Sequence, residues 1–331
     1  MRSADASERP VRSLPTEAPV VELVDGSVGY EGSSQYAVAG VSLQLRAGEI
    51  LGLVGESGCG KSTTARALLA LAPLAQGHIR LHGETIAQHD PRLRQSVQAI
   101  FQNPAGSFNP KRSLVDSVAE PMRVRRIGSP AERRRRALAE LDRVGITEAM
   151  ARRRPHEVSG GQCQRAAIAR ATLLRPEALV CDEPVSALDA SIQAQILELL
   201  DELRREDGLA MLFISHDLGV VASLCDRTAV MYAGQVVEEA ATPVVASAAS
   251  HPYSVILQES VPTLDLAEQP RRVVPRVPTE EVDVRALPGC RFTATCPLVT
   301  DVCHDSAPEL LGSDHRVRCH HPVGSGDPSS S

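Results

Sequence analysis

The feature that most constrains this chain is the segment Gly-Glu-Ser-Gly-Cys-Gly-Lys-Ser at residues 55–62, which has the G-x-x-x-x-G-K-S spacing of a phosphate-binding loop. The apolar run at 50–54 predicts a buried strand, and residues 63–71 predict a helix. Glycines let the loop curl so that successive N–H groups face phosphate oxygens, and the helix N-terminus adds partial positive charge. Strand, loop and helix together predict a nucleotide-binding protein rather than a chance glycine-rich turn.

Two side chains of the loop have the chemistry that a nucleoside triphosphate needs. Lys61 can reach the β- and γ-phosphates, and the Ser62 hydroxyl can bind Mg²⁺. The residues expected to surround the phosphates are Gly55, Glu56, Ser57, Gly58, Cys59, Gly60, Lys61, Ser62 and Thr63.

Composition excludes several other classes of protein. A net charge of −6, 2% aromatic residues and the absence of Trp argue against a basic or base-stacking nucleic-acid binder. No apolar stretch approaches the ~20 residues that a membrane span needs. Residues 1–19 are polar and lack an apolar signal core, so they predict a disordered tail and a cytoplasmic protein.

Residues 20–239 alternate β-rich runs with helical patterns, which predicts an α/β sheet protein. The expected strands are 41–45, 50–54, 99–101, 178–181, 211–214 and 228–232, with a hairpin through Ala233-Gly234 into 235–238. Strand signals vanish between Asn103 and Pro155, which predicts an inserted helical subdomain at about 103–165. Its arginine run at 133–136 is expected to be a solvated helix face. The expected domains are a nucleotide-binding domain at 20–247 and a C-terminal extension at 248–331 with a disordered end.

Two further motifs follow the loop. Residues 179–183 form an apolar run ending in Asp182 and Glu183, of which the first suits the Mg²⁺ shell and the second could polarise an attacking water. Taken alone, the acidic pair could also be a helix cap. The segment Val-Ser-Gly-Gly-Gln at 158–162 precedes a helix and predicts a second anion site, which makes sense if it closes over nucleotide held by another copy.

With these motifs in this order, the chain resembles the ATP-binding subunits of ABC transporters over residues 20–239. The resemblance implies an α/β P-loop ABC-type ATPase core with a β-rich subdomain, an inserted helical subdomain and a small Cys-containing extension. It also assigns residues by motif. These are the Q-loop glutamine Gln102, the signature motif Ser159, Gly160, Gly161 and Gln162 (with Val158 where Leu is usual), the Mg²⁺-associated Asp182, the catalytic carboxylate Glu183, the D-loop Asp189 and the switch histidine His216. Tyr30 sits where the family places an aromatic ring against adenine, and Tyr36 is the alternative.

The resemblance further implies a head-to-tail dimer that sandwiches two ATP molecules between one chain's phosphate loop and the other's signature motif. In that arrangement Ser62, Gln102 and Asp182 surround Mg²⁺. Lys61 neutralises the γ-phosphate, Glu183 activates water, and His216 hydrogen-bonds the γ-phosphate.

Several strings are similar to one branch of the family, the oligopeptide, dipeptide and nickel importers. They are Phe-Gln-Asn-Pro at 101–104, Ser-Phe-Asn-Pro at 107–110, Pro-Val-Ser-Ala-Leu-Asp at 184–189 and His-Pro-Tyr at 251–253. Asn103 and Phe108 depart from the usual Asp and Leu. The branch implies a sister ATPase or second copy, two membrane permeases, an extracytoplasmic solute-binding protein and a place on the cytoplasmic face of the membrane. The alternatives are a nickel or other small-solute importer, a soluble non-transport ABC ATPase and an exporter component.

Four late cysteines form the pattern Cys290-x₅-Cys296-x₆-Cys303-x₁₅-Cys319, followed by two histidines. Disulfides are disfavoured in a cytoplasmic protein, so the hypotheses are Zn²⁺ or iron–sulfur ligation, or structural thiols without metal. The spacing matches neither the C-x₂-C zinc pattern nor the ferredoxin run. Some peptide importers of this branch are associated with a [4Fe–4S] cluster on such cysteines, and this resemblance favours iron–sulfur.

Overall fold

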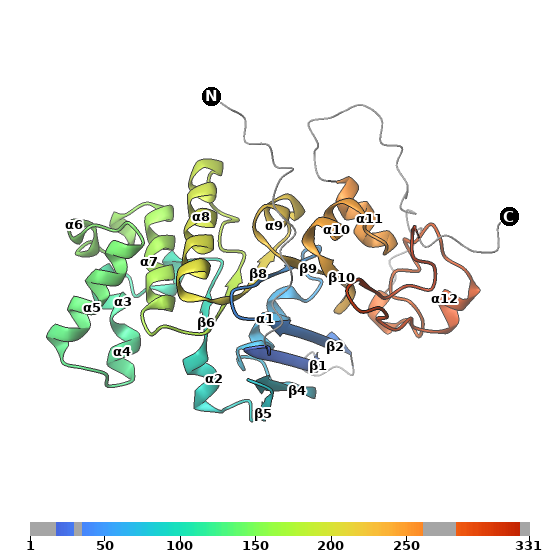
Figure 1. Ribbon diagram of the computed structural model, residues 1–331, viewed down its shortest axis with the longest axis horizontal. Coiled ribbons are helices and arrows are strands. Elements are labelled where there is room, and N and C mark those ends of the chain that lie inside the picture. The colour runs from blue at the N-terminus through green and yellow to red at the C-terminus, as the bar shows by residue number, and fades with distance from the viewer. Residues whose placement is uncertain (1–17, 30–34, 261–282, 325–331) are drawn as a thin grey trace.

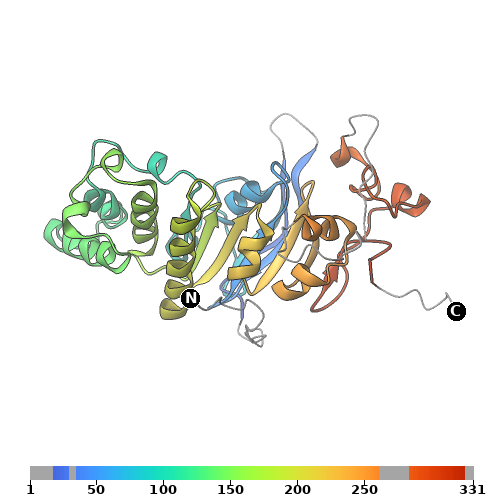
Figure 2. The same cartoon turned by 90° about the horizontal axis from the view of Figure 1, so that it is seen from above.

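The computed structural model describes residues 18–29, 35–260 and 283–324. Most of the predicted N-terminal tail lies outside the described residues, as does the end of the C-terminal extension. Two β-sheets occupy the middle of the molecule, a group of helices lies at one end, and the C-terminal extension lies at the other end (Figures 1 and 2).

The larger sheet has the order β11-β10-β9-β3-β8-β7-β6 and carries the predicted strands except 41–45, which lies in β2 (Tyr36–Leu45) of the smaller sheet. β3, β6, β7, β8 and β9 run parallel, as in other sheets whose two faces are covered. Their bounds are β3 Ile50–Val54, β6 Val97–Ile100, β7 Ala178–Asp182, β8 Ala210–Ser215 and β9 Arg227–Tyr232. The predicted hairpin is confirmed, because β10 (Gln235–Ala241) pairs antiparallel with β9.

The smaller sheet is antiparallel, with the order β2-β1-β4-β5. Its strands are β1 Val21–Gly29, β2 Tyr36–Leu45, β4 Gln76–Leu81 and β5 Glu84–Ile86. The helix α1 (Lys61–Leu68) contacts strands of both sheets, and apolar side chains from the two sheets and α1 form one buried core. The helix that follows the phosphate loop therefore packs between the two sheets.

Helices cover the other face of the larger sheet and build the helical end. α9 packs on β3 and β8, while α3, α5 and α7 pack on one another. The bounds are α2 Pro91–Ser96, α3 Leu114–Val118, α4 Glu120–Val124, α5 Pro130–Arg143, α6 Glu148–Ala151, α7 Gly160–Thr172, α8 Ala190–Asp207 and α9 Leu218–Leu224. Short 3₁₀ turns lie at η1 Ala105–Ser107 and η2 Pro155–Glu157. In the run at 133–136 on α5, Arg134, Arg135 and Arg136 are exposed as predicted, whereas Arg133 is half-buried and donates to the carbonyl of Ile127.

The C-terminal extension docks by adding to the larger sheet. Its strand β11 (Arg316–Val317) pairs antiparallel with β10. The other described elements after β10 are α10 Thr242–Ser247, α11 Pro252–Glu259, η3 Val284–Ala286 and α12 Asp301–Asp305. Among the described helices, none combines the length and apolar character that crossing a membrane demands.

A buried ionic network joins these parts. The Arg227 guanidinium donates to Glu49, to Glu239 and to the carbonyl of Gln44, and Arg316 of the extension donates to the same Glu239. Arg227, Glu49 and Glu239 are each less than 10% exposed, so every charge depends on its partners.

Candidate nucleotide site

The phosphate loop leaves the carboxyl end of β3 in a conformation that requires glycine. Gly55 and Gly60 have φ values of 152° and 115°, which side-chain-bearing residues rarely adopt. A Cβ on Gly55 would lie 2.1 Å from the carbonyl oxygen of Met231 on β9, and a Cβ on Gly60 would lie 3.0 Å from the carbonyl oxygen of Ala37. The loop thus lies directly against the backbone of β9 and β2, and the predicted strand–loop–helix unit is confirmed.

The Lys61 ammonium lies inside the loop. Lys61 is 5% exposed, and its Nζ donates to the carbonyl oxygens of Gly55 at 2.6 Å and Glu56 at 2.8 Å. Burial raises the pKa of the neighbouring Cys59 thiol, so this cysteine stays protonated beside the cation. Ser62 and Thr63 are half-buried at the start of α1.

Oxygen ligands meet where β7 ends. The Ser62 hydroxyl donates to Asp182 Oδ1 at 3.0 Å, although 120 residues separate them in the chain. Burial raises the pKa of the Asp182 carboxyl, because its charged form is partly desolvated, and a cation at this point would favour that form. A hydroxyl and a carboxylate are ligands that Mg²⁺ prefers, so the donor set fits this ion.

Three more predicted residues converge on one carboxylate. Glu183 follows β7 with a left-handed φ of 47°, a conformation that is uncommon for such a residue and is often found at functional sites. Gln102, just after β6, donates through Nε2 to Glu183 Oε2 at 2.9 Å. His216, just after β8, has Nδ1 3.5 Å from Glu183 Oε1. The ends of three neighbouring parallel strands therefore bring Gln102, Glu183 and His216 together.

The signature segment lies elsewhere. Ser159 caps α7: its Oγ accepts from the Gln162 N–H at 3.2 Å, while the Ser159 N–H donates to Gln162 Oε1 at 3.0 Å. Gly160 begins α7, and Gly161 follows with its Cα packed close to Ile192. Because α7 belongs to the helical end and α1 to the middle of the molecule, one chain does not bring this segment to its own phosphate loop (Figure 1).

Asp189 has a structural contact in this chain. Its carboxylate caps α8 by accepting from the Ile192 N–H at 3.0 Å and from the Ser191 hydroxyl at 2.7 Å. The hydroxyl of Ser191, followed by the Ile192 N–H, lowers the pKa of this carboxyl. Of the two candidates for adenine stacking, Tyr36 is half-buried at the start of β2 and Tyr30 lies outside the described residues.

The extension contributes two contacts to the phosphate loop that sequence reasoning missed. The Tyr253 hydroxyl accepts from the Glu56 N–H at 2.9 Å, and Arg285 Nη2 donates to the Gly58 carbonyl at 2.7 Å. These pairs are 197 and 227 residues apart in the chain, and the only signal at either position was the His-Pro-Tyr string.

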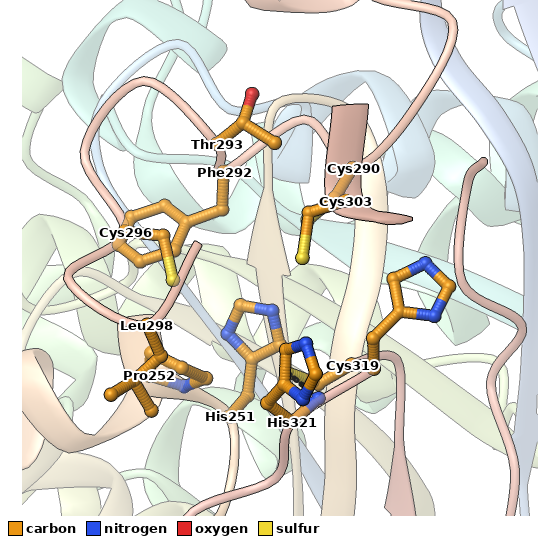
Figure 3. Close-up of a pocket in the computed structure, with 11 residues that line it drawn as sticks. His251, Pro252, Cys290, Phe292, Thr293, Cys296, Leu298, Cys303, Cys319 and His321 are labelled. Atoms are coloured by element: carbon orange, nitrogen blue, oxygen red, sulfur yellow. Dashed lines mark hydrogen bonds between the residues drawn. The ribbon is translucent and has the colours of Figure 1, made fainter. Parts of the chain in front are cut away.

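The four late cysteines line one pocket, together with side chains that include His251 and Phe292 (Figure 3). Burial raises the pKa of Cys319 to about 12 and also raises the pKa of Cys290. Within residues 18–29, 35–260 and 283–324, no three His, Cys, Asp or Glu side chains are arranged to hold a metal ion. The four thiols thus lie together, as the metal hypotheses require, but beyond this shared pocket the described geometry gives no support for the iron–sulfur cluster.

Comparison with known proteins identifies two family regions. Residues 38–186 match the family described as "ABC transporter", and residues 237–303 match "Oligopeptide/dipeptide transporter, C-terminal region". The chain is 42% identical over 290 residues to the oligopeptide transport ATP-binding protein OppF of Escherichia coli K12, covering 86% of this chain and 87% of that one. It is 45% identical over 296 residues to a putative peptide import ATP-binding protein of Brucella abortus, covering 86% of each.

Solved structures agree in fold. The chain is similar to cbiO1 from Clostridium perfringens, part of the ABC transporter complex cbiONQ, with a TM-score of 0.62 and 27% identity over 69% of this chain and 90% of that chain. It is also similar to a dimeric ATP-binding cassette in a post-hydrolysis state bound to ADP and phosphate, with a TM-score of 0.60 and 29% identity over 67% of this chain and 98% of that chain.

Proposed function

Since this chain belongs to the ATP-binding subunits of ABC transporters, we propose that it couples ATP hydrolysis to the import of peptides. The observation that carries the proposal is the C-terminal region at 237–303, which is similar to that of oligopeptide and dipeptide transporters. This region contacts the nucleotide-binding core, because β10 pairs with β9 and the Tyr253 hydroxyl accepts from the Glu56 N–H. Relatives that cover 86% of this chain are themselves named for peptide transport.

In the proposed reaction the phosphate loop, residues 55–63, binds the ATP phosphates through its inward N–H groups and Lys61. Ser62 and Asp182, which already share a hydrogen bond, hold Mg²⁺ together with Gln102. When bound, Mg²⁺ neutralises charge on the β- and γ-phosphate oxygens.

Glu183 is the proposed catalytic carboxylate. It orients water for attack on the γ-phosphate and accepts its proton, while Gln102 holds one of its carboxylate oxygens through the 2.9 Å hydrogen bond. His216 Nδ1 lies 3.5 Å from the other carboxylate oxygen of Glu183, and His216 is proposed to hydrogen-bond the γ-phosphate. Phosphoryl transfer needs positioning and charge stabilisation more than covalent help, and these strand ends provide both.

A second ATP-binding chain is part of the proposal, either a sister subunit or another copy. Its support is the separation between the signature segment on α7 and the phosphate loop before α1. Each chain would then contribute its phosphate loop to one ATP site and its signature segment to the other. Asp189 and Tyr30 or Tyr36 are proposed to complete the site at the dimer interface and at the adenine ring, respectively. Two membrane permeases and an extracytoplasmic solute-binding protein would complete the importer, with this chain on the cytoplasmic face of the membrane.

Gentle purification of the chain from its native membranes, with identification of the proteins that accompany it, tests this assembly. We expect two multi-span permeases, a sister ATPase and a solute-binding protein whose extracted ligand is a peptide. A nickel complex or another small solute on that binding protein would replace peptides as the substrate. Soluble partners alone would overturn the transport role and leave the ATPase assignment intact.

The domain division is proposed as residues 20–247 for the ATPase domain, with its helical subdomain at about 103–165, and 248–331 for the extension.

A [4Fe–4S] cluster or Zn²⁺ on Cys290, Cys296, Cys303 and Cys319 is supported only by their shared pocket, so no step of the reaction depends on it. Iron, sulfide and zinc analysis of anaerobically purified protein decides this point. Iron and sulfide in equal amounts would support the cluster, and the absence of all three elements would remove the metal hypothesis.

A further inference from the structure

The C-terminal extension reaches over the core and holds the tip of the phosphate loop at two points. One is the hydrogen bond from the Glu56 N–H to the Tyr253 hydroxyl, at 2.9 Å. The other is the hydrogen bond from Arg285 Nη2 to the Gly58 carbonyl, at 2.7 Å. Both contacts lie on the exposed side of the loop, where glycines leave the backbone free to move.

The Tyr253 side chain is fixed before it meets the loop. Tyr253 is 2% exposed and lies in the first turn of α11. The Nδ1 of His251 accepts from the Tyr253 N–H at 3.1 Å, and the His251 N–H donates to the fully buried carboxylate of Glu238 on β10 at 2.8 Å. The Tyr253 ring packs against Tyr232, with ring centroids 4.7 Å apart. The hydroxyl is thus presented by a rigid support, which is what a positioning group needs.

Glu56 is held from two sides. Tyr253 accepts its N–H, and Lys61 donates to its carbonyl oxygen at 2.8 Å. In the proposed site the Lys61 ammonium also binds the ATP phosphates, so its hydrogen bond to the Glu56 carbonyl cannot be the only contact it makes. The Tyr253 hydroxyl occupies the Glu56 N–H, so this N–H anchors the loop to the extension and the other inward N–H groups of the loop are left for phosphate.

We propose that Tyr253 is a positioning residue of the phosphate loop and that, with Arg285 as a second tether, it keeps the loop's N–H groups aligned for ATP. The C-terminal extension would then set the nucleotide affinity of this chain. The inference rests on ATP binding and not on which solute is transported.

Two side chains next to Tyr253 line the cysteine pocket. Phe292 lines that pocket and also packs on Tyr253, with ring centroids 5.7 Å apart, and His251 lines it directly before α11. Tyr253 therefore contacts the phosphate loop through its hydroxyl and a side chain of the cysteine pocket through its ring.

The test compares Tyr253→Phe with Tyr232→Phe in the full-length chain. Tyr253→Phe removes only the hydroxyl that holds Glu56. Tyr232→Phe removes a neighbouring hydroxyl that hydrogen-bonds Thr295 instead. Because Glu56 is exposed, water can replace the lost partner, and we expect Tyr253→Phe to fold.

Loss of a neutral hydrogen bond of this kind should raise the Kd for ATP by about two- to tenfold. The Kd is measured by titration with a fluorescent ATP analogue. In the ATPase assay we expect KM to rise by a similar factor and kcat to change little. Amide exchange should quicken in the peptide that spans residues 56–59, and Tyr232→Phe should show none of these effects. Unchanged Kd and unchanged exchange in Tyr253→Phe would overturn the proposal, as would a fall in Tm without a change in Kd.

Arg285→Met tests the second tether independently, because this side chain is partly exposed and its loss leaves the packing of α11 intact. It should raise the Kd in the same direction. In the double variant the two effects should not add, because both tethers act on one loop. Additive effects, or none from Arg285→Met, would mean that the extension does not act on the loop as a unit.

Discussion

If Glu183 is the catalytic base, as proposed, replacing it by Gln should separate ATP binding from hydrolysis. Gln has the shape of Glu and tolerates the same left-handed backbone at φ 47°, and its side-chain oxygen can still accept the hydrogen bond from Gln102. What disappears is the capacity to take a proton from water. General-base catalysis by a side chain contributes about 10²- to 10⁴-fold, which is about 3–5 kcal/mol of the activation barrier. We expect turnover to fall by this factor while ATP affinity stays near that of the wild type.

The assay is phosphate release by the assembled transporter, with nucleotide binding measured in parallel and the closed ATP-bound dimer followed by gel filtration. Glu198→Gln is the matched control, because it makes the same chemical change at an exposed position on α8 that lies outside the site. The control should keep its turnover, and Glu183→Gln should accumulate the closed dimer. Turnover of Glu183→Gln within a factor of about two of the wild type would refute the assignment of Glu183 as the catalytic base.

Other perturbations test other parts of the structure. Lys61→Ala removes a charged donor that the proposal places on the phosphates, so ATP titration should show about a ten- to hundredfold rise in Kd, and an unchanged Kd would contradict this role. Arg227→Met leaves Glu49 and Glu239 buried with too few partners, so urea unfolding should show a loss of about 3 kcal/mol, and a loss below about 1 kcal/mol would mean that the network is not needed. Burial raises the pKa of Cys181 to about 12, so peptide mass mapping should find this thiol unmodified by N-ethylmaleimide at neutral pH until the protein is denatured.

The central strands could be predicted from the sequence because each is a short apolar run bounded by turn signals. β3 has the predicted bounds, β7 is one residue longer than predicted at one end, and β8 is one residue longer at each end. β1 was missed because Asp25 and Gly26 interrupt its apolar pattern, and the structure accommodates them as bulges with Asp25 at φ 48°. The two-residue β11 carries no periodicity at all, and it exists only because β10 offers an edge for pairing.

The residues of the nucleotide site also fall into those that the sequence could assign and those that it could not. Gln102, Glu183 and His216 were assigned to one site through the family resemblance, and the structure supplies the physical reason, because the carboxyl ends of neighbouring parallel strands lie at one edge of a sheet. The hydrogen bond of Tyr253 to Glu56 could not, because it spans 197 residues and depends on how the extension docks. The helix-capping contacts of Asp189 are local, but the motif order pointed to a different role and hid them.

Two parts of the assembly act on the same nucleotide from different directions. The signature segment lies at the helical end, so in the proposed mechanism it would contact ATP only when a second chain supplies it. The extension holds the phosphate loop of its own chain through Tyr253 and Arg285, so its influence is present before any partner arrives. In the proposed mechanism, closure of the dimer would control hydrolysis, whereas the extension would control how readily each chain takes up ATP. A defect confined to the extension should appear in nucleotide binding by the isolated chain, where a defect in the signature segment has no effect.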